Sequence, residues 1–217
     1  MLTRHEANTR GRDFFVGDLH GQYCLLQEAL QGVDFSTTED RLFCVGDLID
    51  RGADSLDCLK LAFMPWFHAV CGNHEDLAWN AFCDGEGSSA WELWMINGGG
   101  WVIDSGVNET RRILQAALSQ LPLAREVAID GRKFGMVHAE PPIDWLRIEE
   151  ADRDSLIWGR SRIQQSDETP VVGVDAVVVG HTIVERPLTL GNVHYLDTGA
   201  FSTGRLTLVD AKELLRW

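Results

Sequence analysis

The chain has 217 residues, and its 19 Lys and Arg residues against 33 Asp and Glu residues give it a formal net charge of −14. This acidity argues against binding to nucleic acid or to an anionic membrane, because both interactions need clustered basic side chains. The length predicts a single domain over residues 1–217, and no apolar stretch reaches the roughly 18 residues that a membrane helix requires.

Short apolar runs alternate with helical patterns along the first part of the chain, after a polar start at residues 1–12. The predicted elements, in order, are a strand at 14–17, a helix at 23–30, a strand at 42–46, a helix at 56–63, a strand at 69–72 and a helix from Glu75. Such alternation is typical of parallel βαβ units. A helical pattern at 89–121 is interrupted by Gly98-Gly99-Gly100, which predicts a helical cap with a tight bend.

The second part of the chain is richer in strands. They are predicted at 123–129, 133–137, 176–179, 193–196 and 205–209. Asp130-Gly131 predicts a hairpin, Gly191-Asn192 predicts a second turn, and the polar residues 164–170 are typical of a linker. Together these elements predict an α/β fold in which two sheets of mixed direction pack face to face with helices outside.

Five cysteines form an odd set without a CxxC pair, at Cys24, Cys44, Cys58, Cys71 and Cys83. Two of them, Cys44 and Cys71, lie inside apolar runs. The pattern is typical of reduced, buried thiols and predicts a cytoplasmic protein.

Residues that can bind a metal ion follow five of the predicted strands. They are Asp18 and His20, Asp47, Asn73, His138, and His181. Loops just past strand ends are held in place by the sheet, so ligands that are distant in sequence can converge there. One ion would take Asp18, His20 and Asp47. The second ion would take Asp47 together with the remaining three, and Asp47 would bridge because a carboxylate has two oxygens.

These donors favour manganese, iron or zinc over calcium, and manganese is the cofactor that we expect. Two such ions would support hydrolysis of a phosphoester by direct attack of a metal-bridging hydroxide. His74 directly follows Asn73, which suits a general acid for the leaving group, and Asp50 could hold its imidazole. Arg51 could grip phosphate oxygens with its planar fork of donors.

Three motifs resemble the signature motifs of the PPP-type serine/threonine protein phosphatases in order and spacing: GDLHG, GDLIDRG and GNHE. Shorter matches such as NGGGW, VHA, WGR, GHT and DTGA resemble the bacteriophage lambda protein phosphatase and its bacterial relatives, and the similarity spans residues 13–209. The resemblance implies a four-layer α/β/β/α metallophosphoesterase sandwich that acts on phosphoserine and phosphothreonine in proteins, with phosphotyrosine and small phosphoesters as further substrates. It also implies the same six metal ligands, His74 as the acid with Asp50 behind it, and phosphate binding by Arg51 and Arg160.

Two positions depart from the pattern of this family. Glu140 stands where the phage and bacterial relatives usually carry aspartate, and Gly159 stands where the phage enzyme carries an amide side chain. Glu140 puts the surroundings of His138 in question, and Gly159 puts the local support of Arg160 in question.

Other functions compete with the phosphatase. A dinucleoside polyphosphate hydrolase would share the metal motifs, and its substrate would be diadenosine tetraphosphate. A nuclease is disfavoured by the acidic composition, and a catalytically dead binding module is disfavoured by the complete set of ligands. Taken singly, the aspartates could be helix caps, the histidines core residues and Arg160 a surface charge.

Overall fold

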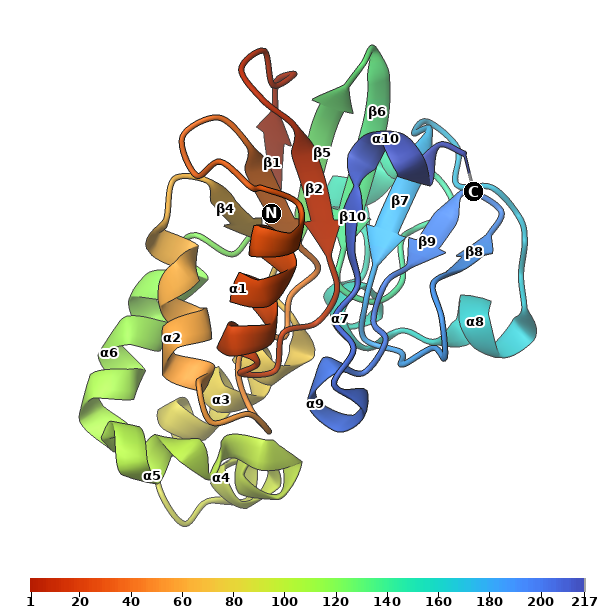
Figure 1. Ribbon diagram of the computed structural model, residues 1–217. Helices are drawn as coiled ribbons and strands as arrows, with labels where there is room; N and C mark the ends of the chain where they lie inside the picture. Colours follow the sequence, from red (N-terminus) through yellow and green to blue (C-terminus); the bar gives the residue numbers. More distant parts are fainter. Residues whose placement is uncertain (217) are drawn as a thin grey trace.

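Two mixed β-sheets form the centre of the computed structural model, which describes residues 1–216 (Figure 1). The four-stranded sheet has the order β10-β2-β3-β4. Its strands are β2 (Asp13–Val16), β3 (Arg41–Cys44), β4 (Phe67–Ala69) and β10 (Leu208–Asp210). The first three run parallel and β10 is antiparallel to β2, so the predicted βαβ units are confirmed.

The six-stranded sheet has the order β1-β5-β6-β7-β9-β8. Its strands are β1 (Leu2–His5), β5 (Ala124–Ile129), β6 (Arg132–Val137), β7 (Ala176–Val179), β8 (Leu188–Leu190) and β9 (Val193–Tyr195). The predicted hairpin joins β5 to β6, with Asp130 at φ 48° and Gly131 at φ 78°. Two positive φ values in a two-residue turn match the twist of the flanking strands.

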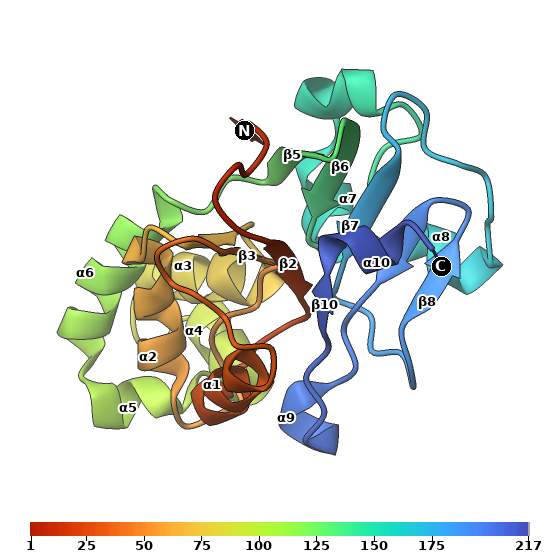
Figure 2. The ribbon, with the colours of Figure 1, turned by 45° about the horizontal axis from the view of Figure 1, so that its top comes forward.

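Helices cover the outer face of each sheet. On the four-stranded sheet these are α1 (Tyr23–Gly32), α2 (Ser55–Lys60) with the 3₁₀ turn η1 (Leu61–Phe63), α3 (Asn73–Asp84), α4 (Ser89–Trp94), the π-helical segment η2 (Met95–Gly99), α5 (Trp101–Ser105) and α6 (Val107–Leu118). The remaining helical elements are η3 (Trp145–Glu150), α7 (Arg153–Trp158), α8 (Ser161–Gln165), α9 (Ala200–Thr203) and α10 (Ala211–Leu214). Figure 2 shows α1–α6 gathered on one side of β2 and β3, with β6 and β7 on the other.

Alternating side chains along the strands build three apolar cores. Phe14 and Leu42 face the helices, whereas Phe15 and Phe43 face the second sheet, because successive strand side chains point to opposite faces. On the second sheet, β6 and β7 contribute to the central core and, through their alternate residues, to an outer core that contains Trp145. The layers are therefore helix, sheet, sheet and helix, which confirms the predicted α/β sandwich.

Some predicted elements have the wrong bounds, and some elements of the structure are not predicted by the sequence. Helix α3 begins at Asn73 rather than Glu75, because Glu75 accepts the N–H of Gly72 and closes the first turn. Strand β1 lies within the polar start of the chain, where its half-exposed edge position leaves no apolar run. The shorter helices of the second half lack enough turns to show a period.

Residues 164–170 are not a linker. The first two end α8, and the buried Arg162 donates to the carbonyls of Asp167 at 2.9 Å and Thr169 at 2.7 Å. A guanidinium has several donors in a fixed planar arrangement, so it can tie two carbonyls of a polar segment to the helix that carries it. The sequence predicts a linker here because composition does not show that Arg162 binds the backbone of this segment.

All five cysteines are free thiols in the structure. Cys44, Cys58 and Cys71 are buried, as expected, whereas Cys24 and Cys83 are exposed and the prediction of buried thiols is wrong for them. Among the described residues, no helix combines the length and the apolar character needed to cross a membrane.

Candidate metal centre and active site

The candidate ligands lie just past the carboxyl ends of the strands, on loops or, for Asn73, at the first residue of α3. Asp18, Asp47 and Asn73 follow β2, β3 and β4, while His138 and His181 follow β6 and β7. Because the two sheets pack face to face, these five strand ends open toward a common region. The sequence rule that residues past strand ends converge therefore holds across both sheets.

Hydrogen bonds join the first two of these loops. The N–H groups of Leu19 and His20 both donate to the carbonyl of Asp47, at 3.1 and 2.8 Å. His20 at φ 43° and Asp47 at φ 49° adopt a left-handed backbone that is uncommon for residues other than glycine. Such strain is typical of functional sites, where the surrounding structure holds the backbone in place.

Glu75 ties the second loop to the third. Its fully buried carboxylate accepts the N–H groups of Leu48 and Gly72, each at 2.8 Å, and that of Asp47 at 3.1 Å. Burial, together with the charge of Asp47, raises the pKa of Glu75 to about 7. Nothing in the sequence pattern predicts this role, because a buried acceptor of backbone N–H groups is visible only in the folded chain.

Asp47 lies at the centre of the site. Two buried groups of side chains offer ligand atoms within 4.8 Å of one another, His20 with Asp47 and His74, and Asp47 with His138 and His181. Asp47 Oδ2 lies 3.5 Å from His20 Nε2, and Asp47 Oδ1 lies 3.5 Å from His138 Nε2. The two carboxylate oxygens thus face different groups, which is the geometry that a bridging ligand requires. Burial would raise the pKa of Asp47, but the neighbouring imidazoles lower it overall.

Asn73 completes the second group. Its Oδ1 atom lies 2.9 Å from His138 Nε2 and 2.8 Å from His181 Nδ1. His138 Nδ1 lies 2.7 Å from the carbonyl of Val45, which can only accept, so Nδ1 carries the proton and Nε2 presents a lone pair. Two acceptors then face each other at His138 and Asn73. A cation bound by both atoms would satisfy them, so these residues fit a metal site.

The imidazoles are in the state that metal binding needs. Burial lowers the pKa of His20 and of His181 to about 3 and also lowers the pKa of His138, so all three remain neutral. His20 Nδ1 lies 3.0 Å from the carbonyl of Ile49, which fixes its tautomer in the same way and leaves a lone pair on Nε2.

Asp18 belongs to neither of the two groups described within residues 1–216. Its carboxylate accepts the N–H of His181 at 3.1 Å and is buried. Burial raises the pKa of Asp18 well above its usual range, and the nearby charges of Asp197, Asp47 and Glu75 add to this shift. Such a cluster of buried carboxylates is costly unless cations neutralise it, which again fits divalent ions at this position.

His74 and Asp50 form a buried pair, as predicted from the sequence. His74 Nδ1 lies 2.7 Å from Asp50 Oδ2. Two indoles donate to the same carboxylate, Trp94 Nε1 at 2.9 Å and Trp101 Nε1 at 2.8 Å, both measured to Oδ1. Burial would lower the pKa of His74, but Asp47 and Asp50 raise it overall. The two tryptophans therefore orient Asp50 as well as packing in the helical cap.

The guanidinium of Arg51 lies against the first group. Its Nη1 atom is 2.7 Å from His20 Nε2, and its Nη2 atom is 2.9 Å from His74 Nε2. The guanidinium carbon stands 4.5 Å from the centre of the Phe201 ring, a cation–π contact from α9. The N–H of Arg51 donates to the carbonyl of Gly98, so the glycine bend of the helical cap reaches the site. No pattern in the sequence predicts the contact between Phe201 and Arg51.

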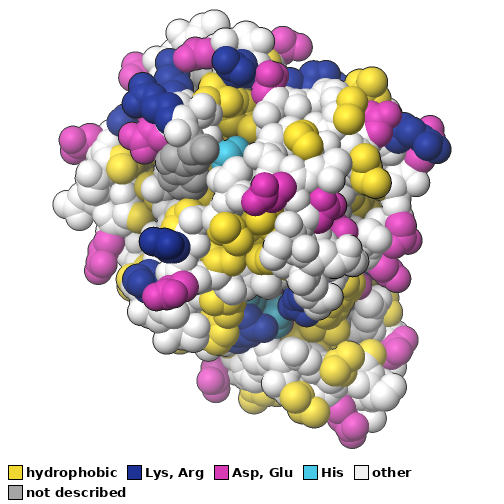
Figure 3. All heavy atoms as spheres, turned by 90° about the vertical axis from the view of Figure 1, so that its right-hand side faces the viewer, with side chains coloured by type: hydrophobic (Ala, Val, Ile, Leu, Met, Phe, Trp, Pro, Cys, Tyr) yellow, Lys and Arg dark blue, Asp and Glu magenta, His cyan; other side chains and the backbone are white. Residues whose placement is uncertain are grey.

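Arg160 lies on the other side, at the start of α8. Its side chain is exposed, and Nε donates to Thr182 Oγ1 at 3.3 Å. Its charge contributes to lowering the pKa of both His138 and His181, after the larger effect of burial. The structure therefore brings the two predicted phosphate-binding arginines to the same cluster. On the face shown in Figure 3, basic side chains flank a recessed patch of histidine, while acidic side chains are spread elsewhere.

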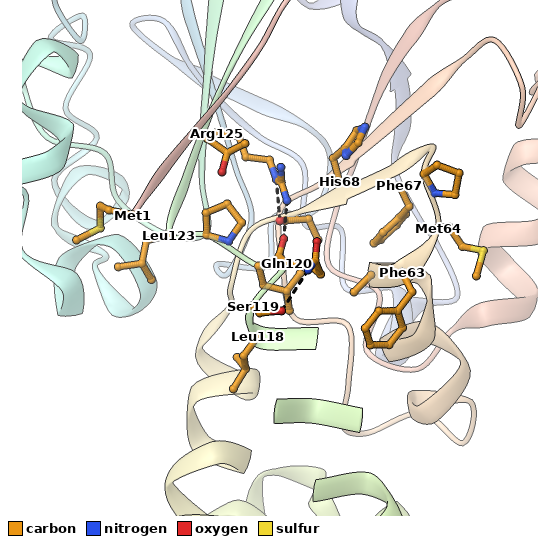
Figure 4. Close-up of a pocket in the computed structure, with 16 residues that line it drawn as sticks. Met1, Phe63, Met64, Phe67, His68, Leu118, Ser119, Gln120, Leu123 and Arg125 are labelled. Carbon is orange, nitrogen blue, oxygen red and sulfur yellow. Dashed lines mark hydrogen bonds between the residues drawn. The ribbon is translucent and has the colours of Figure 1, made fainter. Parts of the chain in front are cut away.

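A separate cavity of about 720 Å³ lies away from this cluster. Figure 4 shows its lining, which includes Phe63, Met64, Gln120 and Arg125. None of the predicted site residues lines it, so it is separate from the candidate metal centre.

Comparisons with known proteins point to one family. Residues 14–185 match the model of the calcineurin-like phosphoesterases. The chain is 36% identical over 203 residues to serine/threonine-protein phosphatase 2 of Escherichia coli, with 91% of each chain covered. It is 47% identical to the symmetrical bis(5'-nucleosyl)-tetraphosphatase of Haemophilus influenzae, but over only 64 residues, 29% of this chain and 23% of the relative. Among solved structures, a putative diadenosine tetraphosphatase has a similar fold, with a TM-score of 0.65, 19% identity and coverage of 97% and 94% of the two chains.

Proposed function

The chain belongs to the calcineurin-like phosphoesterases, a family of metal-dependent hydrolases, and we propose that within this family it is a serine/threonine protein phosphatase. The main support for phosphoester hydrolysis is the buried Asp47. Its two oxygens face two groups of side chains that could bind metal ions, next to the His74–Asp50 pair. The substrate class rests on similarity to a bacterial serine/threonine-protein phosphatase over nine-tenths of both chains. We also propose that residues 1–217 act as one catalytic domain.

The proposed metal ligands are those predicted from the sequence. Asp18, His20 and Asp47 would hold one ion. Asp47, Asn73, His138 and His181 would hold the other, and manganese suits this mixture of carboxylate, imidazole and amide donors. Two divalent ions bound there neutralise phosphoryl charge and supply a nucleophile from water near neutral pH.

The other residues act on the substrate directly. Arg51 and Arg160 would bind the phosphoryl oxygens from two sides of the cluster, since guanidinium donors match phosphate geometry. His74 would donate a proton to the departing seryl or threonyl oxygen. Asp50 holds the imidazole through Nδ1 at 2.7 Å, and Nε2 would give up its proton once Arg51, whose Nη2 atom lies 2.9 Å from it, turns to the phosphoryl oxygens. Phosphotyrosine and small phosphoesters are further proposed substrates, because two divalent ions would act on the phosphoryl group that all these esters share.

A tetraphosphatase remains the second candidate. The local identity of 47% supports it, but this match covers only 29% of the chain, whereas the match to the phosphatase covers 91%. The partner that we propose is therefore a phosphoprotein. A cytoplasmic location is a further proposal, supported by the five free thiols.

We expect chelation to abolish hydrolysis of a phosphoserine peptide and manganese to restore it better than zinc or iron. The reason is that the nucleophile depends on bound dications. Phosphate release would be measured after treatment with a chelator, removal of the chelator, and titration with each metal. Full activity in chelator-containing, metal-free buffer would contradict the proposed function.

A further inference from the structure

Glu140 and Gly159, the two positions that depart from the family pattern, lie against each other. A Cβ atom placed on Gly159 would stand 2.5 Å from Glu140 Cβ, 3.0 Å from Glu140 Oε2 and 2.6 Å from the carbonyl of Ser155. Real Cβ atoms do not approach so closely, so a larger residue at 159 would displace the glutamate. The backbone of Gly159 has φ −59° and ψ 142°, which any residue can adopt. Glycine is therefore needed here for space rather than for conformation.

The room left by Gly159 is used by the Glu140 carboxylate. Its Oε2 atom accepts the N–H of Ser161 at 2.6 Å and that of Arg162 at 3.4 Å. These are the first two N–H groups of α8, which have no partner inside the helix. The residue at the N-cap position, Arg160, has only donors on its side chain and cannot accept these N–H groups. Glu140 thus supplies the cap from a distant part of the chain, while Arg160 Nε donates to Thr182 Oγ1.

Glu140 also connects this cap to the candidate metal centre. It comes two residues after His138, and its own N–H donates to the carbonyl of Ser155 at 3.3 Å. The N–H of Ala139 donates to the carbonyl of Leu156 at 2.8 Å, so the loop after His138 is fastened to α7. One short segment therefore carries both the candidate ligand His138 and Glu140, and Glu140 fixes the backbone next to Arg160.

We propose that Glu140 is a positioning residue that holds Arg160 for binding of a phosphoryl group, and that Gly159 is present because it makes room for Glu140. This inference rests on the proposed function only in taking Arg160 as a phosphate-binding residue. An exposed arginine loses side-chain freedom when it binds, and a fixed backbone lowers the cost of that ordering. The two departures from the family pattern are then linked, because the glycine at 159 leaves the space that the glutamate at 140 needs.

The test measures binding of inorganic phosphate to the full-length, manganese-loaded protein by calorimetry. Glu140→Ala should weaken phosphate binding by about tenfold, which corresponds to the loss of one helix cap, without changing the bound manganese. Glu140→Gln should largely restore binding, because its amide oxygen can accept the same N–H groups. Gly159→Ala should reproduce the loss by displacing Glu140, and this variant serves if Glu140→Ala does not fold.

Two further variants separate positioning from general damage. Arg160→Ala should weaken binding to a similar extent, and Glu140→Ala combined with Arg160→Ala should lose no more than Arg160→Ala alone. Asp210→Ala is the matched control, since Asp210 caps α10 through the N–H of Lys212 at 2.9 Å, and it should leave phosphate binding unchanged. Additive losses in the double variant, or an equal loss in Asp210→Ala, would overturn the proposal. Because phosphate binding needs no turnover, a protein that showed these effects yet left phosphopeptides intact would overturn the proposed function alone.

Discussion

Replacing His74 with Asn is expected to slow hydrolysis of a phosphoserine peptide by about 10²–10⁴-fold, the usual contribution of a positioned general acid. The imidazole is buried, and Asp50 holds its Nδ1 atom at 2.7 Å. The variant loses the ring nitrogen that would give a proton to the seryl oxygen, a poor leaving group. Turnover at saturating manganese would measure the effect.

The loss should depend on the leaving group. Hydrolysis of p-nitrophenyl phosphate should suffer much less, because p-nitrophenolate leaves readily as an anion. Asp50→Asn should show the same dependence in milder form, and both variants should retain the manganese of the unaltered protein. His74 also stands in one of the two ligand groups, with His20 and Asp47. If His74→Asn slowed both substrates equally and lost metal, His74 would be a ligand and its assignment as the acid would be wrong.

Replacing Asp47 with Asn is expected to reduce turnover to the level of the chelated protein. Asp47 Oδ1 faces His138 and Oδ2 faces His20, each at 3.5 Å, so that one substitution weakens both proposed metal sites. The variant also removes the charge that would offset two adjacent dications. Metal content, measured by mass spectrometry after removal of excess manganese, should fall for both ions.

His20→Asn is the matched control for Asp47→Asn, because His20 would serve only one ion. It should lose about half of the metal that Asp47→Asn loses. Equal metal content in the two variants would show that Asp47 does not bridge, even if both variants were inactive.

The framework of the site could be predicted from the sequence because it depends on local signals. Apolar runs mark strands, and a proposed ligand such as Asp18 or His181 follows directly after the run that places it. The family motifs add His74 and Asp50 as the proposed acid and its partner. Convergence then follows from the packing of two sheets, so Asn73 and His138 meet although 65 residues separate them.

The residues that support the site could not be predicted, because their roles arise from packing between distant segments. Trp94 and Trp101 belong to the helical cap, yet both donate to Asp50. Phe201 reaches Arg51 from a short helix near the end of the chain. Glu140 appears in the sequence only as a departure from a pattern, and the structure shows that the cap it forms depends on the absence of a side chain at Gly159.

The most direct test of the central claim is a comparison of products from two substrates. The manganese-loaded protein would be given a phosphoserine peptide and, separately, diadenosine tetraphosphate, and the products would be resolved by chromatography and mass spectrometry. A serine/threonine phosphatase should release inorganic phosphate and the dephosphorylated peptide, at a rate far above any cleavage of the dinucleotide. Rapid cleavage of the dinucleotide with no release of phosphate from the peptide would contradict it.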